Sequence, residues 1–282
     1  MVLRTVWAFA LVAMVGTTTP SWAQGSCAPI PVDTNFRVDA DESSSTAPYS
    51  IDASGVLVRD YDTAYGGLGK FHNPLFIATY ALALHRDWEL SGCTDDTALE
   101  RFFVQVEWFV NNAVERSGAS VWEYPFPNEH YGAEAGWFSG ITQSRVASVL
   151  YRAAAIRKDD SLHDMASSAL RPYLWEEGGL VVWDDEVAWI EEVPTSDTVS
   201  NKVLNGHIAG LQNLVDIARL ADDLDFTAVI EGAVEAVRRD IHLFDAGFIS
   251  YYSLVPLQSG VLPLANRTDY NRTHVDQLEW LA

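Results

Sequence analysis

The chain has 282 residues, of which 48% are hydrophobic and 12% aromatic, enough apolar material for one large domain or two small ones. Its formal net charge at pH 7 is −21. Such an acidic chain would be repelled by nucleic acid and by anionic membrane surfaces, which argues against both as partners.

The first residues have the pattern of an export signal. A charged start at 1–4 precedes an apolar run over 5–16 and a small-x-small cleavage site at 21–23. The apolar run is too short to span a bilayer, so no stable membrane insertion is expected. The alternative interpretation is a retained membrane anchor. We expect residues 1–23 to be removed and the mature protein to be secreted or periplasmic.

The segment 24–71 is rich in Ser, Thr, Asp, Gly and Pro, with short β-type patches. It is predicted to form a short extended or β arm without a core of its own. The two cysteines are Cys27 and Cys93. In an oxidising compartment they are expected to form a disulfide that ties this arm to the first helical region. No metal site is expected, since no ligand set lies near them at a suitable spacing.

From residue 72 onward the apolar residues follow a helical period. Pro74 suits the first turn of a helix, and the polar run 94–97 supplies capping oxygens before the next apolar stretch. Short and long links alternate between the segments, which predicts helical hairpins arranged as an (α/α) toroid or barrel over 72–282. The predicted helices cover 74–88, 98–114, 137–157, 161–173, 202–220, 226–241, and a last one from about 271.

Two polar clusters lie at predicted loop-to-helix junctions in the second half of the chain. The first covers 189–194 and continues at 203–207, and the second covers 267–278. Together they offer carboxylate, phenol, imidazole, amide and guanidinium groups on segments where scaffolds usually present reactive side chains. This mixture indicates acid–base chemistry on a sugar acid.

At these residues the chain resembles the C-terminal domain of D-glucuronyl C5-epimerases, which invert glucuronate to iduronate in heparosan-type polysaccharides. The resemblance runs from about residue 72 to the end and rests on four segments in the same order. These are the Asn-Pro helix at 72–82, Gly-Trp-x-Ser-x-x-x-Gln at 136–143, Glu-Glu-x-Pro at 191–194 with Leu-Asn-Gly at 204–206, and Asp-Tyr-x-x-Thr-His-x-x-Gln-Leu at 269–278. It implies a mainly α, barrel-like fold and a uronate-containing polysaccharide as partner. No cofactor is expected.

The resemblance also implies roles for two residues. Glu192 matches a catalytic residue of the family and is expected to act as the base on one face of the sugar. Tyr270 matches another and is expected to act as acid or base on the opposite face. The structural alternatives are a surface carboxylate for Glu192 and a turn-capping tyrosine for Tyr270. A phenol needs a cationic neighbour to act as a base, and Arg267, Arg272 and His274 are candidates by proximity.

Further residues are expected to bind the substrate. Asn205 and Tyr252 match family positions, with a helix cap and core packing as their alternatives. Arg267 is expected to pair with the substrate carboxylate. Tyr124 is expected at the rim as a sugar contact. The complete set of predicted substrate-binding residues is Tyr124, Asn205, Tyr252, Arg267, Asn271, Arg272 and His274.

The chain departs from the family pattern at two positions. Val193 stands where the family has a catalytic tyrosine, and Val255 stands where it has a substrate-contacting arginine. The chain also ends soon after the last matching segment, which indicates a fragment or a shortened form. A polysaccharide lyase or hydrolase on the same scaffold, or a non-catalytic carbohydrate-binding relative, are therefore alternatives. The sequence leaves a homodimer open.

Overall fold

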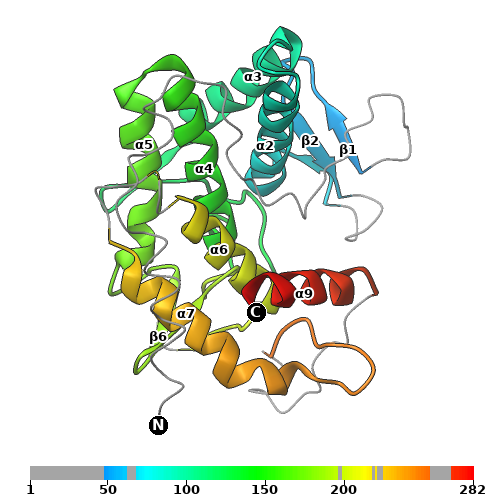
Figure 1. Cartoon of the computed structure of the whole chain (residues 1–282), viewed down its shortest axis with the longest axis vertical. Helices are drawn as coiled ribbons and strands as arrows, with labels where there is room; N and C mark the ends of the chain where they lie inside the picture. Colours follow the sequence, from blue (N-terminus) through cyan, green and yellow to red (C-terminus); the bar gives the residue numbers. More distant parts are fainter. Residues whose placement is uncertain (1–47, 62–67, 196–198, 218–219, 221–224, 255–267) are drawn as a thin grey trace. The chain divides into compact units, whose positions relative to one another are not determined.

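The structure is a computed structural model that describes residues 48–61, 68–195, 199–217, 220, 225–254 and 268–282, without the side chains of 268 and 269. The described part is mainly helical (Figure 1), which confirms the predicted fold class. Two compact units divide the chain, Cys27–Arg171 and Pro172–Ala282, the second together with Met1–Ser26. The toroidal arrangement of the helices and the predicted domain boundaries stay predictions.

The unit Cys27–Arg171 contains a small antiparallel sheet before its helices. In its register Arg59 lies opposite Tyr49 on one side and Phe71 on the other. The middle strand includes the Leu57-Val58 patch that the sequence predicted as β. The strands are β1 (Tyr49–Ile51), β2 (Leu57–Asp60) and β3 (Lys70–Phe71).

Two helical hairpins follow, and side-chain caps begin both helices of the first one. Asn73 Oδ1 accepts a hydrogen bond from Leu75 N at 2.9 Å, and Pro74 occupies the first turn, as predicted. Asp95 caps the second helix by accepting from Ala98 N at 3.0 Å. The helices are α2 (Pro74–Leu90), α3 (Asp96–Asn112), α4 (Gly140–Arg157) and α5 (Asp160–Leu170). Their ends differ from the predicted ones by a few residues.

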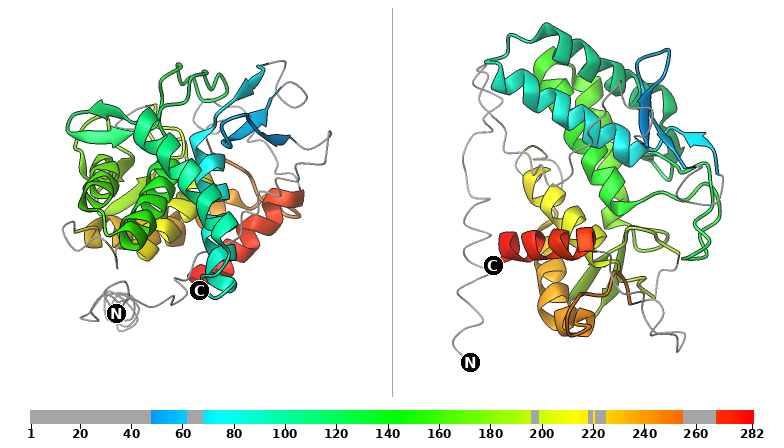
Figure 2. Two further views of the ribbon diagram at one scale, coloured as in Figure 1. Left: turned by 90° about the horizontal axis from the view of Figure 1, so that it is seen from above. Right: turned by 90° about the vertical axis from the view of Figure 1, so that its right-hand side faces the viewer.

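Helix α4 is the most deeply buried element of this unit. It lies beside α5 and also packs on α2 and α3 (Figures 1 and 2). Every residue from Gly140 to Ala154 is buried. Gln143 donates to Ser120 O at 2.9 Å and accepts from Trp122 N at 3.1 Å, which ties α4 to the hairpin of β4 (Val114–Arg116) and β5 (Ala119–Val121). Gln143 therefore has a structural role in this unit.

The unit that contains Pro172–Ala282 joins a β-hairpin to helices that pack around it. The prediction that 189–194 lie at a loop-to-helix junction is wrong for Trp189 and Ile190, because both belong to the second strand, whose four residues are all buried. The turn of the hairpin contains Asp185, whose φ of 55° lies in the left-handed region. The elements are η2 (Arg171–Leu174), β6 (Val181–Asp184), β7 (Val187–Ile190), α6 (Leu204–Ile217), α7 (Thr227–Asp240), η3 (Ile241–Phe244) and α9 (Thr268–Leu281).

Trp189 lies at the centre of the core of this unit. Its ring stacks on His207 from α6, with centroids 4.1 Å apart, and on Phe244 from η3, with centroids 6.0 Å apart. Leu204, Ile208 and the partly buried Leu278 belong to the same apolar cluster. The cluster therefore fixes β7, the first turns of α6, and α9 against one another.

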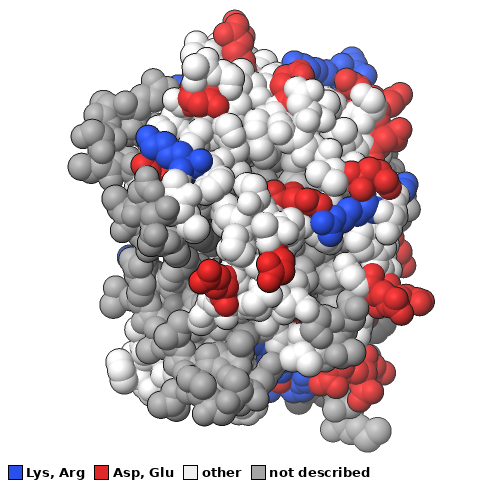
Figure 3. Space-filling model, turned by 180° about the vertical axis from the view of Figure 1, so that it is seen from behind, with Lys and Arg blue, Asp and Glu red and all other residues white. Residues whose placement is uncertain are grey.

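Cys93 is disulfide-bonded, whereas its expected partner, Cys27, lies outside the described residues. The predicted signal segment also lies outside them. Within the described ranges, no helix combines the length and the apolarity needed to cross a membrane. On the face shown in Figure 3, acidic side chains are widespread and basic ones are fewer, as the net charge of −21 requires.

Candidate active site

The carboxyl group of Glu192 lies against the first turn of α6, at Gly206. A Cβ atom on Gly206 would come within 2.5 Å of the Glu192 Cβ and within 3.0 Å of its Cδ. One turn later, a Cβ on Gly210 would come within 2.8 Å of Cγ2 of Ile190. The two glycines thus allow the end of β7 and the residues after it to approach the helix closely. The glycine of the Leu-Asn-Gly sequence is explained by this contact.

A short antiparallel pairing brings Tyr252 to the same turn. Val203 and Ser253 form an isolated β-bridge, and Leu204 N donates to Tyr252 O at 3.2 Å. Leu254 N donates to Lys202 O at 3.3 Å. The segment that carries Tyr252 is therefore held beside the start of α6 by main-chain hydrogen bonds.

Glu192, Tyr252 and Tyr270 form a continuous contact chain. The Tyr252 side chain hydrogen-bonds the Glu192 carboxyl group. The Tyr252 ring meets the Tyr270 ring edge to face, with centroids 4.9 Å apart and planes at 79°. Glu192 and Tyr270 are 78 residues apart in sequence, and the structure joins them through one intervening phenol.

Burial makes Glu192 a carboxyl group that titrates near neutrality. It raises the pKa of Glu192 from 4.5 to about 7, against the opposing effect of the hydrogen bond from Tyr252. The Glu192 Oε2 atom is buried and has no hydrogen-bond partner within the described part of the chain. A half-ionised carboxyl with an unused buried oxygen is suited to accept and release a proton.

The neighbouring Glu191 is a second buried carboxyl, only 1% exposed. Burial raises its pKa to about 8, although hydrogen bonds from Ser200 and from Asn201 N and the charge of Lys202 act in the opposite direction. Asn201 N donates to Glu191 Oε2 at 3.0 Å, and Asn201 Nδ2 donates to Val193 O at 2.5 Å. Asn201 thereby holds the acidic segment against the residues that precede α6.

One face of α9 carries the polar residues of the second cluster. Tyr270, His274 and Gln277 are spaced by four and three residues, so they lie on the same side of the helix. His274 Nδ1 lies 2.8 Å from Ser250 Oγ, and Ser250 N donates to Asn271 Oδ1 at 3.0 Å. Ser250 thus attaches the segment before Tyr252 to α9.

The same face of α9 contacts the first turn of α6. Gln277 Nε2 donates to the main-chain oxygen of Asn205 at 3.0 Å. Both residues are buried, with 3% of Gln277 and 4% of Asn205 exposed. Gln277 Oε1 and Asn205 Oδ1 have no hydrogen-bond partner among the residues that the structure describes. Two buried acceptors therefore accompany Glu192 at this turn.

Known proteins support an assignment of this chain to a family. Residues 116–282 match the model of the D-glucuronyl C5-epimerase C-terminus. The chain belongs to this family. The D-glucuronyl C5-epimerase of Caenorhabditis elegans is 31% identical to it over 201 residues, which cover 64% of this chain and 32% of that protein. The aligned part of the chain thus spans about a third of the length of this relative.

Val193 is one of the two positions at which the chain departs from the expected family pattern, and the structure shows its surroundings. This valine is buried in the core, and its carbonyl oxygen is used by Asn201. It therefore offers no proton-transfer group at the position where the resemblance implies a tyrosine. The phenol that hydrogen-bonds Glu192 here is Tyr252. Val255, the second departure, lies outside the described residues.

Two of the predicted substrate-binding residues have surroundings that do not fit that role. Tyr124 is 3% exposed, its ring stacks on Trp137 with centroids 3.9 Å apart, and its hydroxyl lies 2.7 Å from Thr142 Oγ1. It is a packed core residue and not a rim contact. Arg272 is 86% exposed and its Nε lies 4.0 Å from Asp276 Oδ2 on the same helix, so its side chain faces solvent and not the buried turn of α6.

The remaining predicted residues differ in position. Asn205, Tyr252 and His274 lie at the contact between the start of α6 and α9, together with the proposed catalytic pair. Burial lowers the pKa of His274 to about 4, so this imidazole is neutral at pH 7 and supplies no cation to Tyr270. The side-chain oxygen of Asn271 already accepts hydrogen bonds from Ser250. Arg267 lies outside the described residues.

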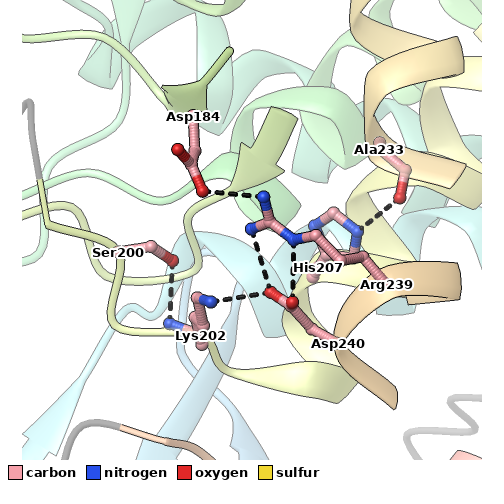
Figure 4. Close-up of polar contacts among 7 residues, drawn as sticks. All are labelled: Asp184, Ser200, Lys202, His207, Ala233, Arg239 and Asp240. Carbon is pink, nitrogen blue, oxygen red and sulfur yellow. Dashed lines mark hydrogen bonds and ion pairs between the residues drawn. The ribbon is translucent and has the colours of Figure 1, made fainter. Parts of the chain in front are cut away.

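An ion-pair network connects the residues before α6 to α7 and to β6 (Figure 4). Lys202 Nζ lies 2.6 Å from Asp240 Oδ2, and Arg239 bridges Asp240 to Asp184 at the end of β6.

His207 accepts a hydrogen bond from Ile190 N at 2.9 Å through Nδ1, and its Nε2 lies 3.0 Å from Ala233 O. Both ring nitrogens are used, so His207 has a structural role in this unit.

Sequence reasoning did not assign a role to Glu191 or Gln277. Gln277 stands in the C-terminal signature of the epimerase family, four residues short of the end of α9. Its spacing of seven residues from Tyr270 corresponds to two helical turns and places both on one face. Applying this period within the signature would have identified it. For Glu191, no comparable signal exists, because its burial is a property of the folded chain and not of its local sequence.

Proposed function

We propose that the protein is an exported epimerase that inverts C5 of uronic acid residues, glucuronate to iduronate, in a polysaccharide. The observation that carries the proposal is the juxtaposition of Glu192, with its pKa raised by burial to about 7, and the phenols Tyr252 and Tyr270. Membership of the D-glucuronyl C5-epimerase C-terminus family supports the reaction class. The signal-like pattern at 1–23 supports export.

Inversion at C5 needs two proton-transfer groups, one on each face of the sugar. The hydrogen at C5 is α to the carboxylate, and its removal leaves an enediolate that must be stabilised before a proton returns on the other face. Glu192 is the group proposed for one face and Tyr270 for the other. Because Glu192 titrates near neutrality, its ionised and protonated forms are both well populated at pH 7, as reversible proton transfer requires.

Three further residues are proposed to assist this pair. Asn205 lies on the turn that Glu192 covers and is proposed to contact the sugar, and Arg267 is proposed to pair with the uronate carboxylate. Tyr252 donates to Glu192 and meets Tyr270, so it is proposed to fix their separation. With valine at 193, Tyr252 is also the phenol placed to polarise the Glu192 carboxyl group.

Exchange of the C5 hydrogen in heavy water tests the proposal. Full-length protein is incubated with glucuronate-containing polymers, beginning with heparosan, and deuterium at C5 and iduronate are measured by NMR. We expect deuterium incorporation without chain cleavage. Glu192→Gln and Tyr270→Phe should each lower the exchange rate by roughly 10²–10⁴-fold, as is typical for loss of one acid–base group.

Matched variants separate chemistry from folding. Glu186→Gln changes an exposed carboxyl on the turn of the same hairpin, and Tyr251→Phe removes a hydroxyl next to Tyr252. Both should retain wild-type exchange. Products with a new ultraviolet absorbance would indicate a lyase. Binding of the polymer with no exchange at C5 would instead identify a non-catalytic carbohydrate-binding protein.

A further inference from the structure

The orientation of the Gln277 amide is fixed by its neighbour. The hydrogen-bond partner of the side chain is the main-chain carbonyl oxygen of Asn205, at 3.0 Å. A carbonyl oxygen can only accept, so the NH₂ group of Gln277 must face it. The Oε1 atom therefore points elsewhere as an acceptor, and it has no partner within the described ranges of the chain.

A buried acceptor of this kind is unusual in a folded protein. Buried polar side-chain atoms nearly always have a hydrogen-bond partner, and exceptions concentrate where a ligand or water completes the set. Gln277 is 3% exposed. Within the described residues, the adjacent Asn205 also has a buried Oδ1 without a hydrogen-bond partner. The same is true of Oε2 of Glu192, whose carboxyl group lies against Gly206, the next residue of α6 after Asn205.

The amide oxygens of Gln277 and Asn205 can only accept hydrogen bonds, and this determines what they can meet on a uronate. The carboxylate of the sugar is ionised at neutral pH and has no hydrogen to donate. The ring hydroxyls are donors. An acceptor-lined part of the site therefore suits the hydroxyl-bearing part of the ring, while the carboxylate must lie toward other groups.

We propose that Gln277 is a substrate-positioning residue that accepts a hydrogen bond from a ring hydroxyl of the uronate, at the turn where Glu192 meets α6. This inference rests on the proposed function, since it takes a uronate as the ligand. Gln277 shares the face of α9 that carries Tyr270 two turns earlier, so a hydroxyl bound to it orients the ring relative to both proton-transfer groups.

Defined oligosaccharides test this assignment. The set contains one parent hexasaccharide and two analogues whose reacting glucuronate is deoxygenated at C2 or at C3. Wild-type protein and Gln277→Leu are compared by C5 exchange and by calorimetric binding. We expect Gln277→Leu to lose roughly ten- to a hundredfold in kcat/KM on the parent, the range for an unpaired buried hydrogen-bonding group. On one deoxy analogue the variant should lose nothing further relative to wild type.

Controls address folding and the underlying proposal separately. Gln277→Met is a second, unbranched replacement in case the leucine variant does not fold. Gln143→Leu makes the same chemical change at a structural glutamine, and it should lower the unfolding midpoint without changing the parent-to-deoxy ratio. If wild-type protein shows no exchange at C5, the proposed function fails, and the binding measurements still decide the role of Gln277. Equal parent-to-deoxy ratios in wild type and in Gln277→Leu, for both analogues, would overturn the inference.

Discussion

Adding one methyl group at Gly206 should disable the site more than it disturbs the fold. In the interior of a helix, Gly→Ala normally stabilises by about 0.5–1 kcal/mol. Here the added Cβ would lie 2.5 Å from the Glu192 Cβ and 3.0 Å from its Cδ. Non-bonded carbon atoms prefer about 3.5–4.0 Å, so Glu192 must withdraw by roughly 1 Å.

The effect on the reaction follows from that displacement. A misplacement of about 1 Å can cost roughly a hundredfold in rate, so kcat/KM for C5 exchange by Gly206→Ala should fall by about that factor. Overpacking costs about 1–3 kcal/mol and the gain in helix propensity offsets part of it, which leaves a net destabilisation of roughly 1–2 kcal/mol. Exchange is measured by NMR in heavy water and stability by urea denaturation.

The same helix offers a matched control one turn later. In Gly210→Ala the new Cβ would lie 2.8 Å from Cγ2 of Ile190, an apolar contact away from the Glu192 carboxyl group. It should be destabilised by a similar amount and retain near wild-type exchange. The reasoning would be refuted if Gly206→Ala kept full activity, or if the two variants lost activity equally.

Two further predictions concern pH. The pKa values of Glu191 and Glu192 are raised by burial from 4.5 to about 8 and about 7, so the folded state retains protons that the unfolded state releases. Their contribution to stability is complete below about pH 4.5 and is lost as pH rises through 7 and 8, at up to about 1.4 kcal/mol per pH unit for each group. Denaturation between about pH 7.5 and 9, where His85, His207 and His274 are neutral in both the folded and the unfolded state, should show a decline that is weaker in Glu191→Gln; an unchanged slope in that variant would contradict the assignment. Tyr252→Phe removes a hydrogen bond that lowers the pKa of Glu192, so the acid limb of the exchange-rate profile should move to higher pH, and a shift to lower pH would exclude the contact.

The helices were predictable because their signals are local. Asn73-Pro74 and Asp95 act within one turn of the backbone that they cap, and the apolar period is a property of each segment by itself. The hairpin of β6 and β7 escaped prediction for the opposite reason. Its strands have four residues each, and the charged turn around Asp185 makes the region look like a solvated acidic loop.

In the candidate site, too, the residues could be predicted from the sequence, whereas their contacts could not. Glu192, Tyr252 and Tyr270 were identified through a family pattern, whereas their contact depends on the pairing of Val203 with Ser253 and on α6 meeting α9. Burial decides the chemistry of Glu191 and Glu192, and burial is a property of the assembled fold. Tyr124 illustrates the reverse error, since its sequence context resembles a ligand contact and its packing is that of a core residue.

The burial of Glu192 has a consequence for how kinetic data on this protein should be interpreted. An inflection close to neutrality in a rate profile is conventionally ascribed to imidazole, whereas here a carboxylic acid occupies that range. Dissociation of a carboxylic acid absorbs very little heat, and dissociation of an imidazolium absorbs much more. Recording the inflection at several temperatures would therefore tell the two apart: a nearly stationary midpoint belongs to the acid, and one that drifts downward on warming belongs to a histidine.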